Sequence, residues 1–196
     1  WADSLQDLTL SLDDQHSSLA ASDHVFALPE SFFLSFERLH FLELLDIEKW
    51  SINNLSSSLP RVAKGWPKIR ALHLPLEHRP GIGLDVLRAI ADSCAELRSL
   101  KVGVDLSSLP PLFEECGASF ALRHGLNMLS VNSFCGISHG KKGILLIARY
   151  LNILFPYLKM DLAPTTNFKE TAELWKEVYE LVQAFQLVRE DERNRD

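Results

Sequence analysis

The sequence predicts an α/β fold in which short parallel strands alternate with helices, and two observations lead to it. The first is a recurring pattern of an apolar residue, two variable residues, an apolar residue, one variable residue and a further apolar residue. It occurs six times, at residues 5–10, 42–47, 69–74, 97–102, 126–131 and 157–162. The second is the spacing of these copies, whose first residues are 37, 27, 28, 29 and 31 positions apart. A generic α/β domain has no reason to keep one motif at one spacing.

The pattern has a direct physical meaning because side chains alternate between the two faces of a strand. Leu72 and Leu74 therefore point to one face and His73 to the other. One such unit cannot bury its apolar face alone, whereas copies placed side by side form a parallel sheet with a continuous core. Three of the five steps fall in the range of roughly 20–29 residues that is typical of leucine-rich repeats. The predicted fold class is an irregular leucine-rich-repeat solenoid, with parallel strands joined by helical crossovers and a C-terminal capping helix.

The repeat-like domain is predicted to occupy residues 1–163. Its strands are expected near residues 5–12, 42–48, 69–76, 97–104, 126–132 and 157–162. Residues 26–39 are expected to be an insertion in which Phe32, Phe33, Phe36 and Leu39 have helical spacing. Helices are also expected at residues 84–94 and 144–155. Residues 55–64 are expected to form an irregular segment because Pro60 interrupts it, and residues 109–116 to form a short crossover. Trp66 is expected to cover the core where two repeats meet.

A separate capping helix is predicted over residues 164–190. Asn167 is a suitable N-cap, and Glu170 stands three residues later as its reciprocal partner. The helix is expected to cover the end of the sheet. Residues 191–196 are expected to form a charged tail. One apolar face is predicted from the 3, 4, 3, 4 spacing of Thr171, Leu174, Trp175, Val178, Leu181, Val182, Phe185 and Val188.

Composition narrows the functional classes. The formal net charge is −6 over 196 residues, which does not favour nucleic acid or an anionic membrane as a partner. An apolar run of 18 residues and a secretory signal are both absent from the sequence. Three cysteines at wide spacing indicate a reducing compartment, so an intracellular protein, cytoplasmic or nuclear, is expected. Because the chain begins with Trp1, we expect it to be a piece of a longer protein.

The sequence predicts no catalytic, cofactor or metal site, and therefore no enzyme. Residues 136–142 partly match a phosphate-binding loop, but three residues separate the glycines where four are required, and Lys142 replaces the hydroxyl residue. The seven histidines do not pair with cysteine or carboxylate at zinc-binding spacing. A Gly-x-Ser-x-Gly motif does not occur. We therefore expect surface histidines, or histidines whose hydrogen bonds are satisfied within the fold.

Two stretches carry a family resemblance, Trp-Pro-Lys-Ile-Arg-Ala-Leu-His-Leu from Trp66 and Ile-Ala-Asp-Ser-Cys-Ala-Glu-Leu-Arg-Ser-Leu-Lys-Val from Ile90. They resemble the leucine-rich-repeat region of fungal F-box proteins, as does the block at residues 148–159 with the helix that follows it. The resemblance implies a subunit that recruits substrates to a cullin-type ubiquitin ligase, with an F-box ahead of Trp1. The chain departs from the common repeat at the position of the Asn or Cys ladder, which holds Asp13, Trp50, Glu77, Asp105 and Phe134. Leu-Pro-Glu-Ser-Phe-Phe from Leu28 slightly resembles an F-box start, but a repeat strand follows too soon.

The outward positions of the strands form the candidate binding surface, because solenoids bind partners on the face that their strands present. We expect a protein partner there, a ubiquitination substrate under the F-box resemblance. Two alternatives stay open: a small-molecule enzyme of irregular α/β type, and a structural fragment that needs preceding repeats to cover Leu5, Leu8 and Leu10. The predicted partner-binding residues are Asp7, Thr9, Asp46, Glu48, His73, Ser99, Lys101, Met128, Ser130 and Asn132.

Overall fold

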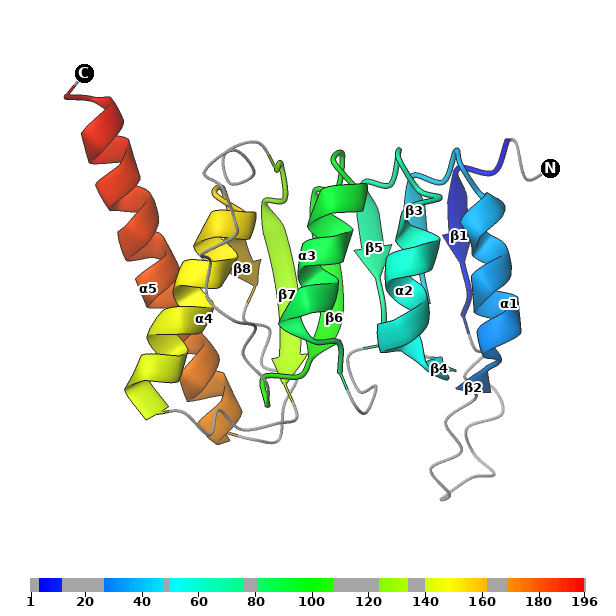
Figure 1. The fold of residues 1–196 in the computed structure, drawn as a ribbon, viewed down its shortest axis with the longest axis horizontal. Coiled ribbons are helices and arrows are strands. Elements are labelled where there is room, and N and C mark those ends of the chain that lie inside the picture. Colours follow the sequence, from blue (N-terminus) through cyan, green and yellow to red (C-terminus); the bar gives the residue numbers. More distant parts are fainter. Residues whose placement is uncertain are drawn as a thin grey trace.

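A six-stranded parallel sheet runs through the computed structural model, with helices along one of its faces (Figure 1). The structure describes residues 4–11, 27–47, 50–75, 81–107, 124–133, 140–161 and 169–195. The sheet is open, and its strand order β1-β3-β5-β6-β7-β8 follows the chain order. Each strand of this sheet therefore pairs with the strands of the same sheet that precede and follow it along the chain. This mixed α/β architecture with a parallel sheet agrees with the prediction from the sequence.

The strands lie within or next to the predicted ranges but are shorter. They are β1 Asp7–Thr9, β3 Leu44–Asp46, β5 Ala71–His73, β6 Ser99–Val104, β7 Met128–Ser133 and β8 Lys159–Asp161. The apolar residues that flank them, such as Leu42, Ile69 and Leu97, are buried without belonging to a strand. One row of the sheet joins the fourth residue of every motif copy, in the order Leu8, Leu45, Leu72, Leu100, Leu129 and Met160.

A second, two-stranded parallel sheet was not predicted. It pairs β2 (Ala27–Leu28) with β4 (Ser51–Ile52). Each of these strands precedes a helix, and Leu28 and Ile52 are buried. The small sheet therefore links the starts of the first two helices.

The helices are α1 Glu30–Ser35, continued by the 3-10 turn η2 Phe36–Arg38, then α2 Leu55–Ala63, α3 Leu84–Ser93, α4 Gly140–Leu154 and α5 Lys169–Arg193. Helices α1, α2, α3 and α4 lie on the same face of the sheet (Figure 1).

The sequence analysis missed one helix and misplaced the bounds of others. Residues 55–63 form a helix rather than an irregular segment, although Pro60 lies inside it. Its missing N–H removes one intrahelical bond, while the buried side chains of Leu55, Leu59 and Val62 hold this helix on the core. Helix α4 begins at Gly140 rather than after Gly143, and α5 continues to Arg193 because charged residues such as Glu and Arg are good helix formers. The predicted crossover at residues 109–116 lies outside the described residues.

The contact between the first two helices depends on a close backbone approach at Gly65. A Cβ atom at this position would lie 2.0 Å from the backbone oxygen of Glu37, so only glycine fits without a shift of the chain. The next residue, Trp66, is completely buried, and its indole Nε1–H donates to the backbone oxygen of Phe36 at 2.8 Å. Trp66 therefore lies in the core between η2 and α2.

Two buried polar side chains connect parts of the chain that are far apart in sequence. His124 Nε2–H donates to the backbone oxygen of Cys94 at 3.0 Å, and its Nδ1 accepts from the backbone N–H of Leu126 at 3.1 Å. This pattern requires the neutral imidazole, and burial lowers the pKa of His124. The hydroxyl of Tyr150 on α4 donates to the backbone oxygen of Leu84 at the start of α3, at 3.0 Å.

Helix α5 packs against α4 at the β8 end of the molecule (Figure 1). Trp175, Val178 and Val182 are buried there, in agreement with the predicted apolar face. Val188 was predicted on the same face but is 56% exposed, because the last turns of the helix extend beyond the core. The side chain of Thr171 lies outside the described part.

Candidate functional site

The face of the sheet opposite helices α1–α4 carries two rows of outward side chains, which flank the row that contains the buried residues Leu45, Leu72, Leu100 and Leu129. The first row is Asp7, Leu44, Ala71, Ser99, Met128 and Lys159, and the second row is Thr9, Asp46, His73, Lys101, Ser130 and Asp161. Where their side chains are described, these residues are exposed or half-buried, and Met128 is 46% exposed. The two rows together form the candidate binding face.

Eight of the ten residues proposed from the sequence lie in these two rows. They are Asp7, Thr9, Asp46, His73, Ser99, Lys101, Met128 and Ser130. Glu48 lies outside the described residues. Asn132 lies on β7 beside Gly103 of β6, and its side chain is outside the described part.

Sequence reasoning missed Asp161 at the β8 end of the second row, and it also missed two residues of the first row, Leu44 and Lys159. Both occupy the third position of the recurring pattern, like Asp7 and Met128, so the pattern itself holds the signal that would have found them. Lys159 was overlooked because the sixth copy of the pattern is the weakest. Its exposed ammonium places a positive charge at the β8 end of the first row.

A string of polar contacts crosses three neighbouring strands of the face. His73 Nδ1 lies 3.4 Å from Asp46 Oδ2, and His73 Nε2 lies 3.4 Å from Ser99 Oγ. The side chains of His73 and Asp46 are 26% and 32% exposed, so water reaches both. The separations exceed the roughly 2.7–2.9 Å of a strong charge-assisted hydrogen bond. This arrangement orients the three side chains on the surface of the sheet.

The same three residue types, Asp, His and Ser, form the nucleophilic relay of serine hydrolases. Such enzymes also need N–H donors aimed at the oxygen of the tetrahedral intermediate. In a parallel sheet the backbone N–H groups point sideways to neighbouring strands, as the Leu74 N–H does to the backbone oxygen of Lys101 at 2.8 Å. The surroundings of Ser99 therefore lack the geometry that acyl transfer uses, within the described part of β5 and β6.

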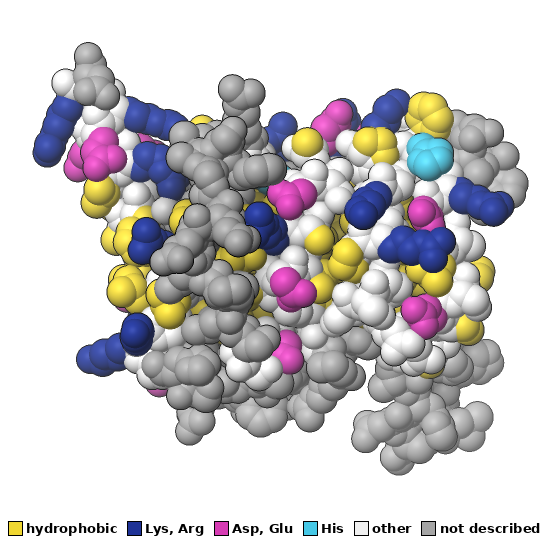
Figure 2. Space-filling model, viewed as in Figure 1, with side chains coloured by type: hydrophobic (Ala, Val, Ile, Leu, Met, Phe, Trp, Pro, Cys, Tyr) yellow, Lys and Arg dark blue, Asp and Glu magenta, His cyan; other side chains and the backbone are white. Residues whose placement is uncertain are grey.

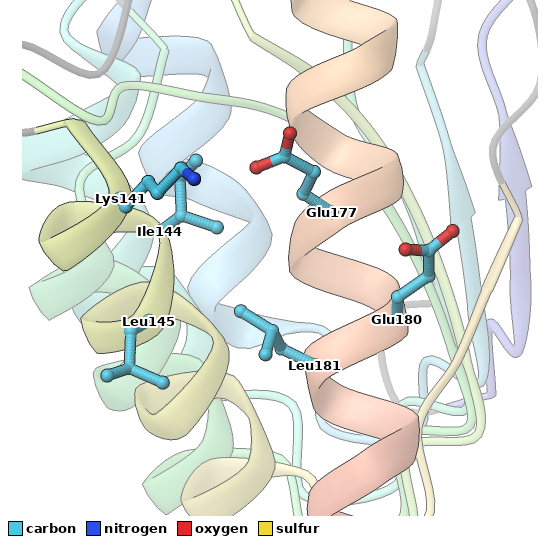
Figure 3. A pocket seen from close by; sticks show the side chains of 6 residues that line it. All are labelled: Lys141, Ile144, Leu145, Glu177, Glu180 and Leu181. Atoms are coloured by element: carbon cyan, nitrogen blue, oxygen red, sulfur yellow. The ribbon is translucent and has the colours of Figure 1, made fainter.

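A separate hollow lies between α4 and α5, with a volume of about 580 Å³. Its lining residues are Lys141, Ile144, Leu145, Glu177, Glu180 and Leu181. Lys141 and Glu177 extend toward each other across the gap, whereas Glu180 points away from α4 (Figure 3). The sequence did not predict this hollow, because the helix was expected to begin only at residue 144 and Leu181 was placed on the apolar face of the capping helix.

The helix-covered side shows no comparable organisation. Basic, acidic and apolar side chains are interspersed over α1–α3 in the space-filling view (Figure 2). Within residues 4–195, as far as they are described, no cluster of three His, Cys, Asp or Glu side chains could hold a metal ion. Nor does any helix among the described residues combine the length and apolarity needed to cross a membrane.

No protein-family model, curated protein or solved structure matches this chain significantly.

Proposed function

We propose that this chain is a protein-interaction module that binds a protein partner on the binding face of its sheet. The observation that carries the proposal is the different character of the two sheet faces. Helices α1–α4 lie on one face (Figure 1). Among the described residues, the other face presents two rows of exposed or half-buried side chains. A face built from adjacent strands offers a partner a rigid array, because every position is fixed by the strand register. Its mixture of charged, polar and apolar groups is typical of non-obligate protein interfaces.

The regular register supports the assignment of an irregular leucine-rich-repeat solenoid. The central leucines Leu45, Leu72, Leu100 and Leu129 lie side by side, although 27–29 residues separate each from the next. Helix α5, packed against α4 at the β8 end, takes the place of the terminal cap that such repeats require. At the position proposed for the Asn or Cys ladder, the Asp105 carboxylate accepts from the backbone N–H of Ser107 at 2.8 Å.

The resemblance to fungal F-box proteins suggests the biological role. In this role the module recruits a substrate to a cullin-type ubiquitin ligase, and an F-box encoded before Trp1 connects it to the ligase. Reading the 5′ end of the intact transcript tests this directly. A three-helix F-box segment supports the role, whereas a different preceding domain removes the ubiquitin inference and leaves the interaction module.

The binding face itself is tested by two substitutions that leave the core unchanged, Lys101→Glu and Met128→Arg. Matched controls lie elsewhere on the surface: Lys64→Glu beyond the end of α2, and Leu187→Arg on α5, where Leu187 is 62% exposed. The tagged full-length protein is purified from its source, and the co-purifying proteins are quantified by mass spectrometry. We expect both face variants to lose a partner that both controls retain. Equal recovery with all four variants would refute the proposed face.

The enzyme alternative makes a different prediction about Ser99. If the string Asp46–His73–Ser99 acted as a nucleophilic relay, Ser99→Ala would abolish hydrolysis of an activated ester such as p-nitrophenyl acetate. We expect any background hydrolysis to be the same in both proteins. A Ser99-dependent burst of p-nitrophenol would instead favour the enzyme.

A further inference from the structure

The charges on the binding face are ordered along the direction that crosses the strands. In the first row the acidic end is Asp7 on β1 and the basic end is Lys159 on β8. Both are exposed, and neither forms an ion pair with another residue of the described chain. Between them lie Leu44, Ala71, Ser99 and Met128, which carry no charge. The row therefore has two opposite charged ends and a mainly apolar centre.

The second row repeats this order of charges only from β3 to β6, because it ends in an acidic residue on β8. In the second row, Asp46 on β3 precedes Lys101 on β6, with His73 between them. The row continues to Asp161 on β8, whose side chain is outside the described part.

Just before the strands begin, Glu43 is followed by Arg70 and Arg98 at equivalent positions. The Arg70 guanidinium lies 2.9 Å from the Glu43 carboxylate, and Arg98 Nη1 donates to the backbone oxygen of Gly125 at 3.0 Å. From β1 to β6 the acidic residues Asp7, Glu43 and Asp46 thus precede the basic residues Arg70, Arg98 and Lys101. Two carboxylates depart from this order: Glu96, which lies 3.4 Å from Arg70, and Asp161 on β8.

We propose that the partner binds through a segment with the complementary order of charges, a basic residue over Asp7, an apolar centre over Leu44 and Met128, and an acidic residue over Lys159. This inference rests on the proposed function, since it specifies what the binding face recognises. Five strand intervals of about 4.8 Å place the two charged ends roughly 24 Å apart. A segment spans this distance with about seven residues when extended, or about sixteen as an α-helix.

Charge complementarity selects the orientation of this segment. An exposed ion pair contributes little affinity, but an inverted segment would place like charges at both ends of the row. The apolar contacts at Leu44 and Met128 then supply the area that is removed from water. The two ends determine direction, and the centre determines whether binding occurs.

The test uses a phage-displayed library of random sixteen-residue peptides, selected on the purified chain at low ionic strength. Peptides that also bind Met128→Arg are discarded, so the remaining ones depend on the face. On the wild-type chain we expect basic residues near one end and acidic residues near the other. On Asp7→Lys we expect acidic residues at both ends, and on Lys159→Glu basic residues at both ends. Lys64→Glu serves as the charge-change control and should select the wild-type pattern.

A peptide selected on the wild-type chain is then labelled with fluorescein. The Kd for its binding to the wild-type chain and to each variant is measured by fluorescence anisotropy. We expect about a three- to tenfold weakening for each single reversal, with a smaller effect at high salt. A peptide with exchanged lysine and glutamate residues should bind the double variant Asp7→Lys/Lys159→Glu within about threefold of the original pair.

The outcomes separate the two proposals. Peptides that require Met128 but ignore both charge reversals would overturn the charge order and leave the binding face intact. A selection that yields no peptide sensitive to Met128→Arg would refute the proposed function together with this inference.

Discussion

Arg189 on α5 is expected to hold this helix against the end of α4. Its guanidinium donates to three oxygens: the Asn152 side-chain Oδ1 at 2.7 Å, the Asn152 backbone oxygen at 3.3 Å and the Pro156 backbone oxygen at 3.2 Å. Asn152 is only 8% exposed. The last carbonyl groups of a helix lack intrahelical partners and carry partial negative charge, so a cation is favourable here. The substitution Arg189→Ala removes this cation and leaves a nearly buried amide without its partner.

The expected cost follows from these contacts. A hydrogen bond to a charged group contributes about 1.5–3 kcal/mol, and an unsatisfied buried group costs about 1–3 kcal/mol. Arg189 is partly exposed, however, so water replaces some of the lost contacts. We therefore expect the free energy of α5 docking to fall by about 1–2 kcal/mol, which corresponds to a factor of about 5–30 in the open population.

Hydrogen exchange measured by mass spectrometry reports this change directly. The amides of α5 should exchange about 5–30 times faster in Arg189→Ala, while those of β5 and β6 keep their wild-type rates. Arg193→Ala is the matched control, since this exposed residue lies one turn further along α5 without a hydrogen bond to α4 among the described contacts. Arg189→Lys should lie between the two, because an ammonium cannot reach all three oxygens at once.

A double-mutant cycle with Asn152→Leu tests whether the Asn152–Arg189 contact accounts for the lost docking free energy of α5. If the Asn152–Arg189 contact carries the effect, Arg189→Ala should cost markedly less in the Asn152→Leu background. Unchanged α5 exchange in Arg189→Ala, or full additivity of the two substitutions, would show that apolar packing alone holds the helix.

Three further predictions concern the core. Gly65→Ala should lower the free energy of unfolding in urea by about 1–3 kcal/mol, because its Cβ meets the backbone oxygen of Glu37; Gly83→Ala, which meets only the end of a side chain, should stay within about 0.5 kcal/mol of wild type. Burial lowers the pKa of His124, so the unfolded chain binds a proton more readily than the folded chain. The free energy of unfolding should therefore be highest above the unfolded histidine pKa of about 6.5 and should decrease as the pH falls below it. This decrease should be smaller in His124→Gln. Cys94, whose pKa burial raises to about 12, should resist iodoacetamide at pH 8 in the folded protein and react in urea, as read by peptide mapping.

The repeating apolar pattern predicted the parallel sheet because its signal is long-range and redundant. Leu72 and Leu100 occupy equivalent positions in two copies, and a slip of one residue would move either one to the solvent face. The helix at residues 84–93 was predicted for the same reason, since its apolar residues recur every three or four positions and form one face of a helix. Both features depend on periodicity, which a single sequence contains in full.

Features that depend on a few atoms could not be predicted in this way. Strands β2 and β4 have two residues each, too few for any periodic signal. Pro60 predicted a break, but the burial of Leu59 and Val62 against the core outweighed the loss of one hydrogen bond. The contacts of His73 with Asp46 and Ser99 require the strand register and the side-chain rotamers together.

The order of the strands has a consequence for how the protein gains and loses its structure. In the six-stranded sheet, each pair of neighbouring strands joins residues only 27–37 positions apart, from Leu8 with Leu45 to Leu129 with Met160. Closing such loops costs far less entropy than pairing the two ends of the chain, so neighbouring units can assemble without waiting for distant ones. The β8 end can consequently open and close while β3, β5 and β6 remain paired, and a protease or an unfolding force applied at α5 would meet a series of small barriers in place of one large one.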